Sequence, residues 1–238
     1  MRRIPTLLTL IAVSGCIRLG SPEVGGPPTR DVSRPGGGLV DSALSGSTMD
    51  RISSVGGDRA ACRAALASAR IEWSVLPDRG AAGGCNLFGG GTLDVDWGTV
   101  ARLNPAGPES TCETALALSV WRRQSVETAA REILGSDVVQ IDLMGAYSCR
   151  RVGNRPDGRI SAHGRGNAID FGGVRLRDGR RITVVQDWNG GGAEQRFLRR
   201  IHADACLIFG TVLSPEYNAA HRDHLHLEVR EADWTMCR

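Results

Sequence analysis

Two short stretches hold four of the five histidines in this chain. They are Ser161-Ala-His163-Gly-Arg-Gly166-Asn-Ala-Ile-Asp170 and His221-Arg-Asp223-His224-Leu-His226. Imidazole nitrogens and carboxylate oxygens are ligands of Zn²⁺, and three protein ligands with one open position is the catalytic arrangement. A zinc ion lowers the pKa of a bound water toward neutrality, which makes a nucleophile able to attack an amide. The two stretches therefore predict a zinc site.

The second stretch continues as an alternating segment up to Val229. Side chains of a strand alternate between its two faces. We therefore expect His224, His226 and Glu228 on one face and the intervening apolar residues on the other. The apolar face can pack on a core while both imidazoles point into a cleft.

The first stretch must turn if His163 and Asp170 are to meet, and glycine gives a chain that freedom. Hydrolysis of an amide also needs a base that takes a proton and passes it to the leaving amine. Asp223 lies three residues before His226, and His224 lies two before it. Either side chain could reach the water, so the sequence leaves both as candidates.

The composition is that of a soluble globular protein, with 41% apolar and 23% charged residues. A length of 238 residues is enough for one well-packed domain and a tail. The net charge of +3 is too small to indicate nucleic-acid binding.

The first 16 residues are typical of an exported lipoprotein. A charged start precedes an apolar run from Thr6 to Val13 that is too short to span a bilayer. Ser14-Gly15-Cys16 then resembles a bacterial lipobox, which implies a signal peptide over residues 1–16 and a lipid on Cys16. Ile17 follows rather than Asp. By resemblance to lipoproteins of Gram-negative bacteria, this implies a periplasmic protein anchored to the outer membrane.

The other six cysteines are Cys62, Cys85, Cys112, Cys149, Cys206 and Cys237. An even number in an exported chain predicts three disulfides, with the pairing open. No Cys-x-x-Cys pair is present, which argues against a cysteine zinc site.

Residues 17–55 are rich in Gly, Pro and Ser, so we expect a flexible tether there, and residues 56–238 are the expected domain. The expected helices are Asp58–Ala69, Thr111–Arg123, Val126–Leu134 and Ala193–Ala205, and the expected strands are Ile71–Leu76, Thr92–Val100, Val138–Tyr147 and Arg181–Trp188. This mixture predicts an α+β domain with a largely antiparallel sheet flanked by helices.

Local signals refine two of these helices. Ser110 and Glu113 have the spacing of a capping box at the start of the expected helix Thr111–Arg123. Ser125 is the expected N-cap of the helix Val126–Leu134, and Gly135 is its expected end. Trp121 and His202 are expected to be structural.

The spacing Ser161-x-His163-x-x-Gly166-x-Ala168-x-Asp170 resembles the signature of zinc D-alanyl-D-alanine peptidases, which are grouped with murein endopeptidases and the hedgehog domain. The chain is more similar to the bacterial extensin-like C-terminal domain family, over about residues 60–238. That similarity rests on Thr111-Cys112, Tyr147-Ser-Cys149-Arg150, the two histidine stretches, Ser214-Pro-Glu-Tyr-Asn218 and Cys237-Arg238.

The resemblance implies a hedgehog-like fold and a role for individual residues. His163, Asp170 and His226 match the zinc ligands. The base of the D-alanyl-D-alanine enzymes is a glutamate at the position of Asp223, whereas the Asp-His-x-His run of the murein endopeptidases points to His224. Arg150 matches an arginine that binds a substrate carboxylate or stabilises an oxyanion, and Ser161 is expected to orient substrate or a ligand.

Together these features predict a zinc-dependent hydrolase of peptidoglycan peptide stems or cross-links. The alternative is a non-catalytic, metal-binding envelope lipoprotein that uses the same cleft to bind the cell wall or a protein partner. The scissile bond and the oligomeric state stay open.

Overall fold

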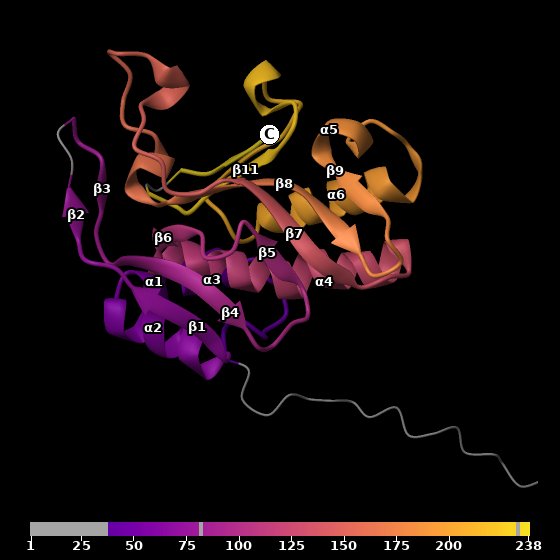
Figure 1. Ribbon diagram of the computed structural model, residues 1–238, viewed down its shortest axis with the longest axis horizontal. Coiled ribbons are helices and arrows are strands. Elements are labelled where there is room, and N and C mark those ends of the chain that lie inside the picture. Colours follow the sequence, from indigo (N-terminus) through magenta and orange to yellow (C-terminus); the bar gives the residue numbers. More distant parts are fainter. Residues whose placement is uncertain (1–37, 81–82, 232–233) are drawn as a thin grey trace, which may run out of the picture. The chain divides into compact units, whose positions relative to one another are not determined.

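A mixed β-sheet carries both histidine stretches above one face and a layer of helices against the other (Figure 1). The computed structural model describes residues 38–80, 83–231 and 234–238. The predicted signal peptide with Cys16, and the first part of the predicted tether, lie outside the described residues. No helix in the described part of the chain has the length and apolar character needed to cross a membrane.

The first half of the described chain contains α1 (Thr48–Gly56), α2 (Arg59–Ser68), β1 (Ile71–Val75), β2 (Arg79–Gly80), β3 (Asn86–Leu87), β4 (Gly90–Asp96), β5 (Arg102–Asn104), β6 (Glu109–Thr111), α3 (Cys112–Trp121), η1 (Arg122–Val126), α4 (Glu127–Ala129) and η2 (Ala130–Leu134). The second half contains β7 (Val138–Gly145), η3 (Val152–Asn154), η4 (Ala162–Arg165), β8 (Ala168–Leu176), β9 (Arg181–Thr183), α5 (Val184–Asp187), α6 (Gly192–Ala205), β10 (Thr211–Leu213), η5 (Ala219–His221), β11 (Leu225–Glu228) and β12 (Met236–Cys237).

The larger sheet has the strand order β12–β10–β11–β8–β7–β5, with β9 also paired to β8. The central pairs β10–β11, β11–β8, β8–β7 and β8–β9 are antiparallel, whereas β5–β7 and β10–β12 are parallel. A smaller antiparallel sheet has the order β1–β4–β6. The predicted α+β class with a largely antiparallel sheet is therefore confirmed.

The helical layer begins with an uninterrupted run from Cys112 to Leu134, in which η1 and η2 are π-helical. The prediction of two helices separated at Ser125 is wrong. Ser125 is buried inside the run, and its hydroxyl donates a hydrogen bond to Asp204 instead of capping a helix. Gly135 ends the run with φ of 66°, as predicted.

The start of this run also differs from the prediction. Thr111, rather than Ser110, is the N-cap residue, and its hydroxyl accepts a hydrogen bond from the Thr114 amide. Trp121 is fully buried, as expected. Its indole N–H donates to the Ile201 carbonyl, and its ring lies edge-on to Phe171 of β8 at 5.1 Å. This contact fastens the helical layer to the strand that carries Asp170.

The segment Arg181–Trp188 is only partly a strand, so that prediction is wrong in its second half. The chain leaves β9 at Thr183, whose hydroxyl accepts the Gln186 amide and starts α5. The run of β-branched residues favours a strand, but the Thr183 cap and the burial of Val184 stabilise a helix.

The predicted tether ends earlier than residue 55. From residue 38 the chain packs on the domain, where Val40 and Ile52 are each only 1% exposed. Arg123 donates to the Asp41 carboxylate and Gln124 to the Val40 carbonyl. The average composition of residues 17–55 concealed the few apolar residues that make α1 possible, so the folded part begins before Gly56.

Three disulfides form among the described residues, as predicted, and the structure supplies the pairing that the sequence left open. They join Cys62 to Cys112, Cys85 to Cys149, and Cys206 to Cys237. The first links α2 to the start of α3. The second fastens the segment after β7 to the chain just before β3, close to the histidine stretches.

Candidate metal centre

His163, Asp170 and His226 converge on one point above β8 and β11. His163 Nε2 lies 3.1 Å from Asp170 Oδ1 and 3.2 Å from His226 Nδ1. His226 Nδ1 lies 3.0 Å from the same Asp170 oxygen. All three side chains are nearly inaccessible to solvent. The structure therefore brings together the three residues that the sequence singled out as metal ligands.

His163 is positioned by a short turn rather than by a strand. The Ser161 hydroxyl accepts the His163 amide at the start of η4, and Gly166 reverses the chain with φ of 71°. The His163 Nδ1–H donates to the Ala146 carbonyl at 2.8 Å, which leaves Nε2 as the nitrogen that faces Asp170 and His226. Ser161 thus orients His163 through the backbone.

His226 and Asp170 face each other because β11 and β8 pair in that register. Leu225 and Leu227 point to the opposite face and are fully buried. The alternation predicted for this segment is therefore correct. Glu228 lies two residues beyond His226 and accepts a hydrogen bond from its Nε2 at 3.3 Å, so Nδ1 is the atom turned to the centre.

The electrostatics of the metal-free cluster are those of a tight ion pair. Burial disfavours a charge on Asp170, but hydrogen bonds from His163 and His226 outweigh it and hold the pKa of that carboxyl well below its usual range. Burial also disfavours a charge on His226, yet its bonds to Asp170 and Glu228 raise its pKa to about 9. In the absence of a metal, a proton on His226 balances the Asp170 charge.

The donor set fits a zinc ion. Two ligand atoms bound tetrahedrally to zinc lie roughly 3.3 Å apart, given bonds of about 2.0–2.1 Å. The distances of 3.0 to 3.2 Å among the three ligand atoms are close to that value. Both imidazoles also carry the hydrogen bond on their other nitrogen that metal-binding histidines need, to Ala146 and to Glu228.

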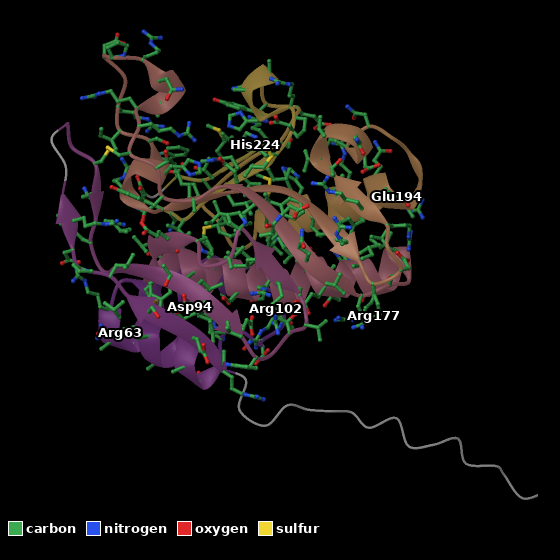
Figure 2. The ribbon with its side chains drawn as sticks, in the orientation of Figure 1. Arg63, Asp94, Arg102, Arg177, Glu194 and His224 are labelled. Atoms are coloured by element: carbon green, nitrogen blue, oxygen red, sulfur yellow. A yellow bond between two sulfur atoms is a disulfide. The ribbon has the colours of Figure 1, made fainter. Side chains whose placement is uncertain are left out.

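Asp223 and His224 stand beside this cluster in different ways. His224 Nε2 lies 3.6 Å from Asp170 Oδ1, whereas its Nδ1 is 2.9 Å from Asp223 Oδ1. Figure 2 shows His224 above β8 and β11, in the orientation of Figure 1. The hydrogen bond from His224 holds the pKa of Asp223 below its ordinary value. His224 therefore faces the candidate metal, and Asp223 stands behind it.

Arg150 approaches the cluster from the other side of Asp170. Its Nη2 lies 3.9 Å from Asp170 Oδ2, and its side chain remains 39% exposed. Arg150 is thus within reach of a group at the centre, and among the described residues its guanidinium makes no hydrogen bond.

Sequence reasoning assigned no role to His221, Asn218 or Gly145. The His221 ring lies 5.1 Å from His224 and 5.9 Å from His226, and its Nδ1–H donates to Asn218 Oδ1. Burial and the two nearby imidazoles lower the pKa of His221 to about 4, which keeps it neutral. The one sequence feature that could have identified His221 is its position in the second histidine stretch.

Gly145 is required by the close approach of β7 to Asp170. A Cβ at this position would lie 2.5 Å from Asp170 Oδ2. No sequence pattern identifies this requirement, because it depends on the pairing of Gly145 with Asp170 across two strands.

The cluster opens into a cleft of about 350 Å³. Its walls include Arg150 and Arg159 from the segment after β7, and Tyr217, His221 and His224 from the loop before β11. In Figure 1 these two segments rise from the same face of the sheet. The ligand atoms are thus buried but reachable by a substrate.

The fifth histidine has a structural role, as expected. His202 Nε2 donates to the Arg238 carbonyl, and its ring lies edge-on to Trp188. Cys206 and Cys237 lie nearby, but their sulfurs are bonded to each other. Of the two groups of metal-ligating side chains in the described residues, only the His163 cluster has its ligand atoms available.

Comparison with known proteins confirms the resemblance to the extensin-like family. No curated protein and no solved structure matches the chain. One family model matches residues 60–238, which include both histidine stretches and all six disulfide cysteines. The chain belongs to the family described as extensin-like protein C-terminus.

Proposed function

We propose that this chain is a zinc-dependent hydrolase that cleaves amide bonds in the peptide stems or cross-links of peptidoglycan. The observation that supports this most directly is the convergence of three ligand atoms within 3.2 Å of one another at the base of an open cleft. A structural zinc site is closed by a fourth protein ligand. Among the described residues this cluster has three ligands, and its fourth side is the cleft.

His163, Asp170 and His226 would hold the ion. When bound, zinc would supply a Lewis acid that activates water for attack on a carbonyl carbon. His224 is the proposed proton carrier, because its Nε2 faces the cluster while Asp223 keeps the proton on Nδ1. The imidazole takes the proton of the nucleophile and returns it to the leaving amine. Asp223 holds the ring in that orientation, as an acceptor with a lowered pKa.

Arg150 is proposed to bind a substrate carboxylate or to stabilise the negative charge that develops on the carbonyl oxygen. Its guanidinium is 39% exposed and 3.9 Å from Asp170, so it can reach a group placed at the cluster. Ser161 supports His163 through the hydrogen bond at the start of η4.

The proposed place of action is the bacterial envelope. The lipobox at Cys16 implies export and a lipid anchor, which we assign to the outer membrane of a Gram-negative bacterium. Three disulfides are typical of an oxidising compartment such as the periplasm. The resemblance of residues 161–170 to the zinc D-alanyl-D-alanine peptidases supports peptidoglycan peptides as the substrate.

The test is digestion of isolated sacculi by the purified full-length chain with stoichiometric zinc. We expect new amine termini and released peptides, identified by mass spectrometry. His163→Ala and His226→Ala should abolish both release and zinc binding, whereas Arg155→Gln, an exposed change outside the cleft lining, should alter neither.

Undiminished release by the two histidine variants would overturn the proposal. Binding of sacculi without new amine termini would favour the alternative, a non-catalytic envelope protein that uses the same cleft.

A further inference from the structure

The segment between β7 and η4 forms one wall of the cleft and is strongly basic. We call residues 149–160 the basic arm, since they include four arginines and one aspartate. The arm contributes Arg150, Val152, Arg159 and Ile160 to the cleft lining. Its arginines differ in what they contact. Some are paired with groups of the arm itself, whereas others can contact a ligand in the cleft.

Two arginines of the arm have partners within it. Arg151 donates to the Gly158 carbonyl, and Arg155 pairs with Asp157. Arg159 lines the cleft, and its guanidinium has no hydrogen bond or ion pair among the described residues. Its charge acts on Glu231 at longer range, but that carboxylate is already held by Arg165 and Asn167.

The backbone around Arg159 is held in place. The Arg159 carbonyl accepts the Val152 amide, and Arg151 bridges to Ile160 across the arm. The Cys85–Cys149 disulfide fastens the base of the arm. A positioned backbone reduces the ordering cost of binding, because only the Arg159 side chain has to be fixed by the ligand.

The acidic side chains that the structure describes in the cleft lining already have partners of their own. Asp170 is engaged by His163 and His226, and Glu228 by His226. A zinc ion in the cluster would add further positive charge. An exposed guanidinium in such a cleft favours an anionic partner, and its planar donors suit a carboxylate held by two hydrogen bonds.

We infer that Arg159 is a specificity residue that selects acidic peptides, by binding a free carboxylate of the substrate on the arm side of the cleft. This inference rests on the proposed function and adds a second anion-binding position to that of Arg150. Arg159 lies outside the groups assigned to metal binding and proton transfer, so its replacement should change selection rather than chemistry.

The test compares two probes: soluble stem peptides released from sacculi, and the same peptides with their carboxylates converted to amides by carbodiimide and ammonia. Binding to the zinc-loaded full-length chain is measured by calorimetry at low and high salt. We expect Arg159→Gln to weaken binding of the acidic peptides about tenfold and to leave the amidated peptides unchanged. Arg155→Gln, on the same arm but paired with Asp157, is the matched control.

The inference is overturned if Arg159→Gln keeps the preference for acidic peptides, or if Arg155→Gln loses it equally. Thermal melting of both variants verifies folding, which neither exposed change should affect. Hydrolysis is measured in the same samples as the appearance of new amine termini. Absence of new amine termini in the wild type would contradict the proposed function, while the binding preference would still decide the role of Arg159.

Discussion

The Asp223 carboxylate accepts a hydrogen bond from His224 Nδ1 at 2.9 Å, which turns His224 Nε2 toward the candidate metal ligands. The sequence left these two residues as competing bases. The structure gives them complementary positions, with His224 facing the cluster and Asp223 behind it. A pairing of this kind holds an imidazole in one tautomer and one orientation.

The first prediction concerns this pair. We expect His224→Ala to lower kcat/KM on stem peptides by roughly 10²–10⁴-fold, because the proposed proton carrier is lost. Asp223→Asn should cause a smaller loss, since the imidazole remains but is less firmly oriented. Zinc content, measured in the same preparations, should be unchanged in both. A larger loss for Asp223→Asn than for His224→Ala would make Asp223 the base.

The second prediction concerns proton release on metal binding. His226 has a pKa raised to about 9 in the metal-free protein, and a histidine must be deprotonated to bind a metal. Zinc affinity should therefore rise with pH until about pH 9 and then level off. Calorimetry in buffers of different ionisation enthalpy should detect close to one proton released per zinc at pH 7. Release of none would contradict the ion pair described for the metal-free cluster.

The same raised pKa has a consequence for stability. A histidine whose pKa is higher in the folded than in the unfolded state stabilises the fold fully below about pH 6.5, and this contribution is lost as pH rises through its folded pKa. The metal-free protein should thus lose stability between about pH 6.5 and 9, whereas His226→Gln should lack this part of the profile. Denaturant unfolding with a chelator present measures the difference.

The fourth prediction concerns Gly145. A methyl group there would lie 2.5 Å from Asp170 Oδ2, so Gly145→Ala must displace the carboxylate or the strand. We expect a 10–100-fold loss of zinc affinity, the range typical of a change in the groups that orient a ligand. Gly80→Ala, where the new methyl group meets nothing within 4 Å, is the control. Equal zinc affinity in both variants would show that the cluster tolerates the shift.

The features that sequence reasoning placed correctly are those set by local pattern. The alternation from His224 to Val229 predicted which face His226 occupies, and the spacing around Gly166 predicted that His163 and Asp170 meet. Both depend on backbone geometry within a few residues. The register that sets His226 opposite Asp170 depends on two distant strands, so only the structure could supply it.

Other features could not be read from the chain because they depend on distant partners. Arg122 and Arg123 are buried in the middle of the long helical run, where charged residues are normally exposed. Asp96, at the end of β4, pairs with both of them. The predicted break at Ser125 is wrong for the same reason, because the Ser125 hydroxyl donates a hydrogen bond to Asp204 on α6.

The last prediction separates two roles of the disulfides. Loop closures of 50 and 64 residues should each stabilise the fold by roughly 4 kcal/mol through the unfolded state. Replacing Cys62 and Cys112 together by alanine should therefore lower the melting temperature, with little change in KM. Replacing Cys85 and Cys149 should lower it comparably and also raise KM, because Cys149 adjoins Arg150 and Cys85 packs near the His163 turn at Gly164. Identical KM values for the two double variants would show that the Cys85–Cys149 bond contributes to stability and not to the cleft. An unchanged melting temperature in both variants would refute the stabilising role of these bonds.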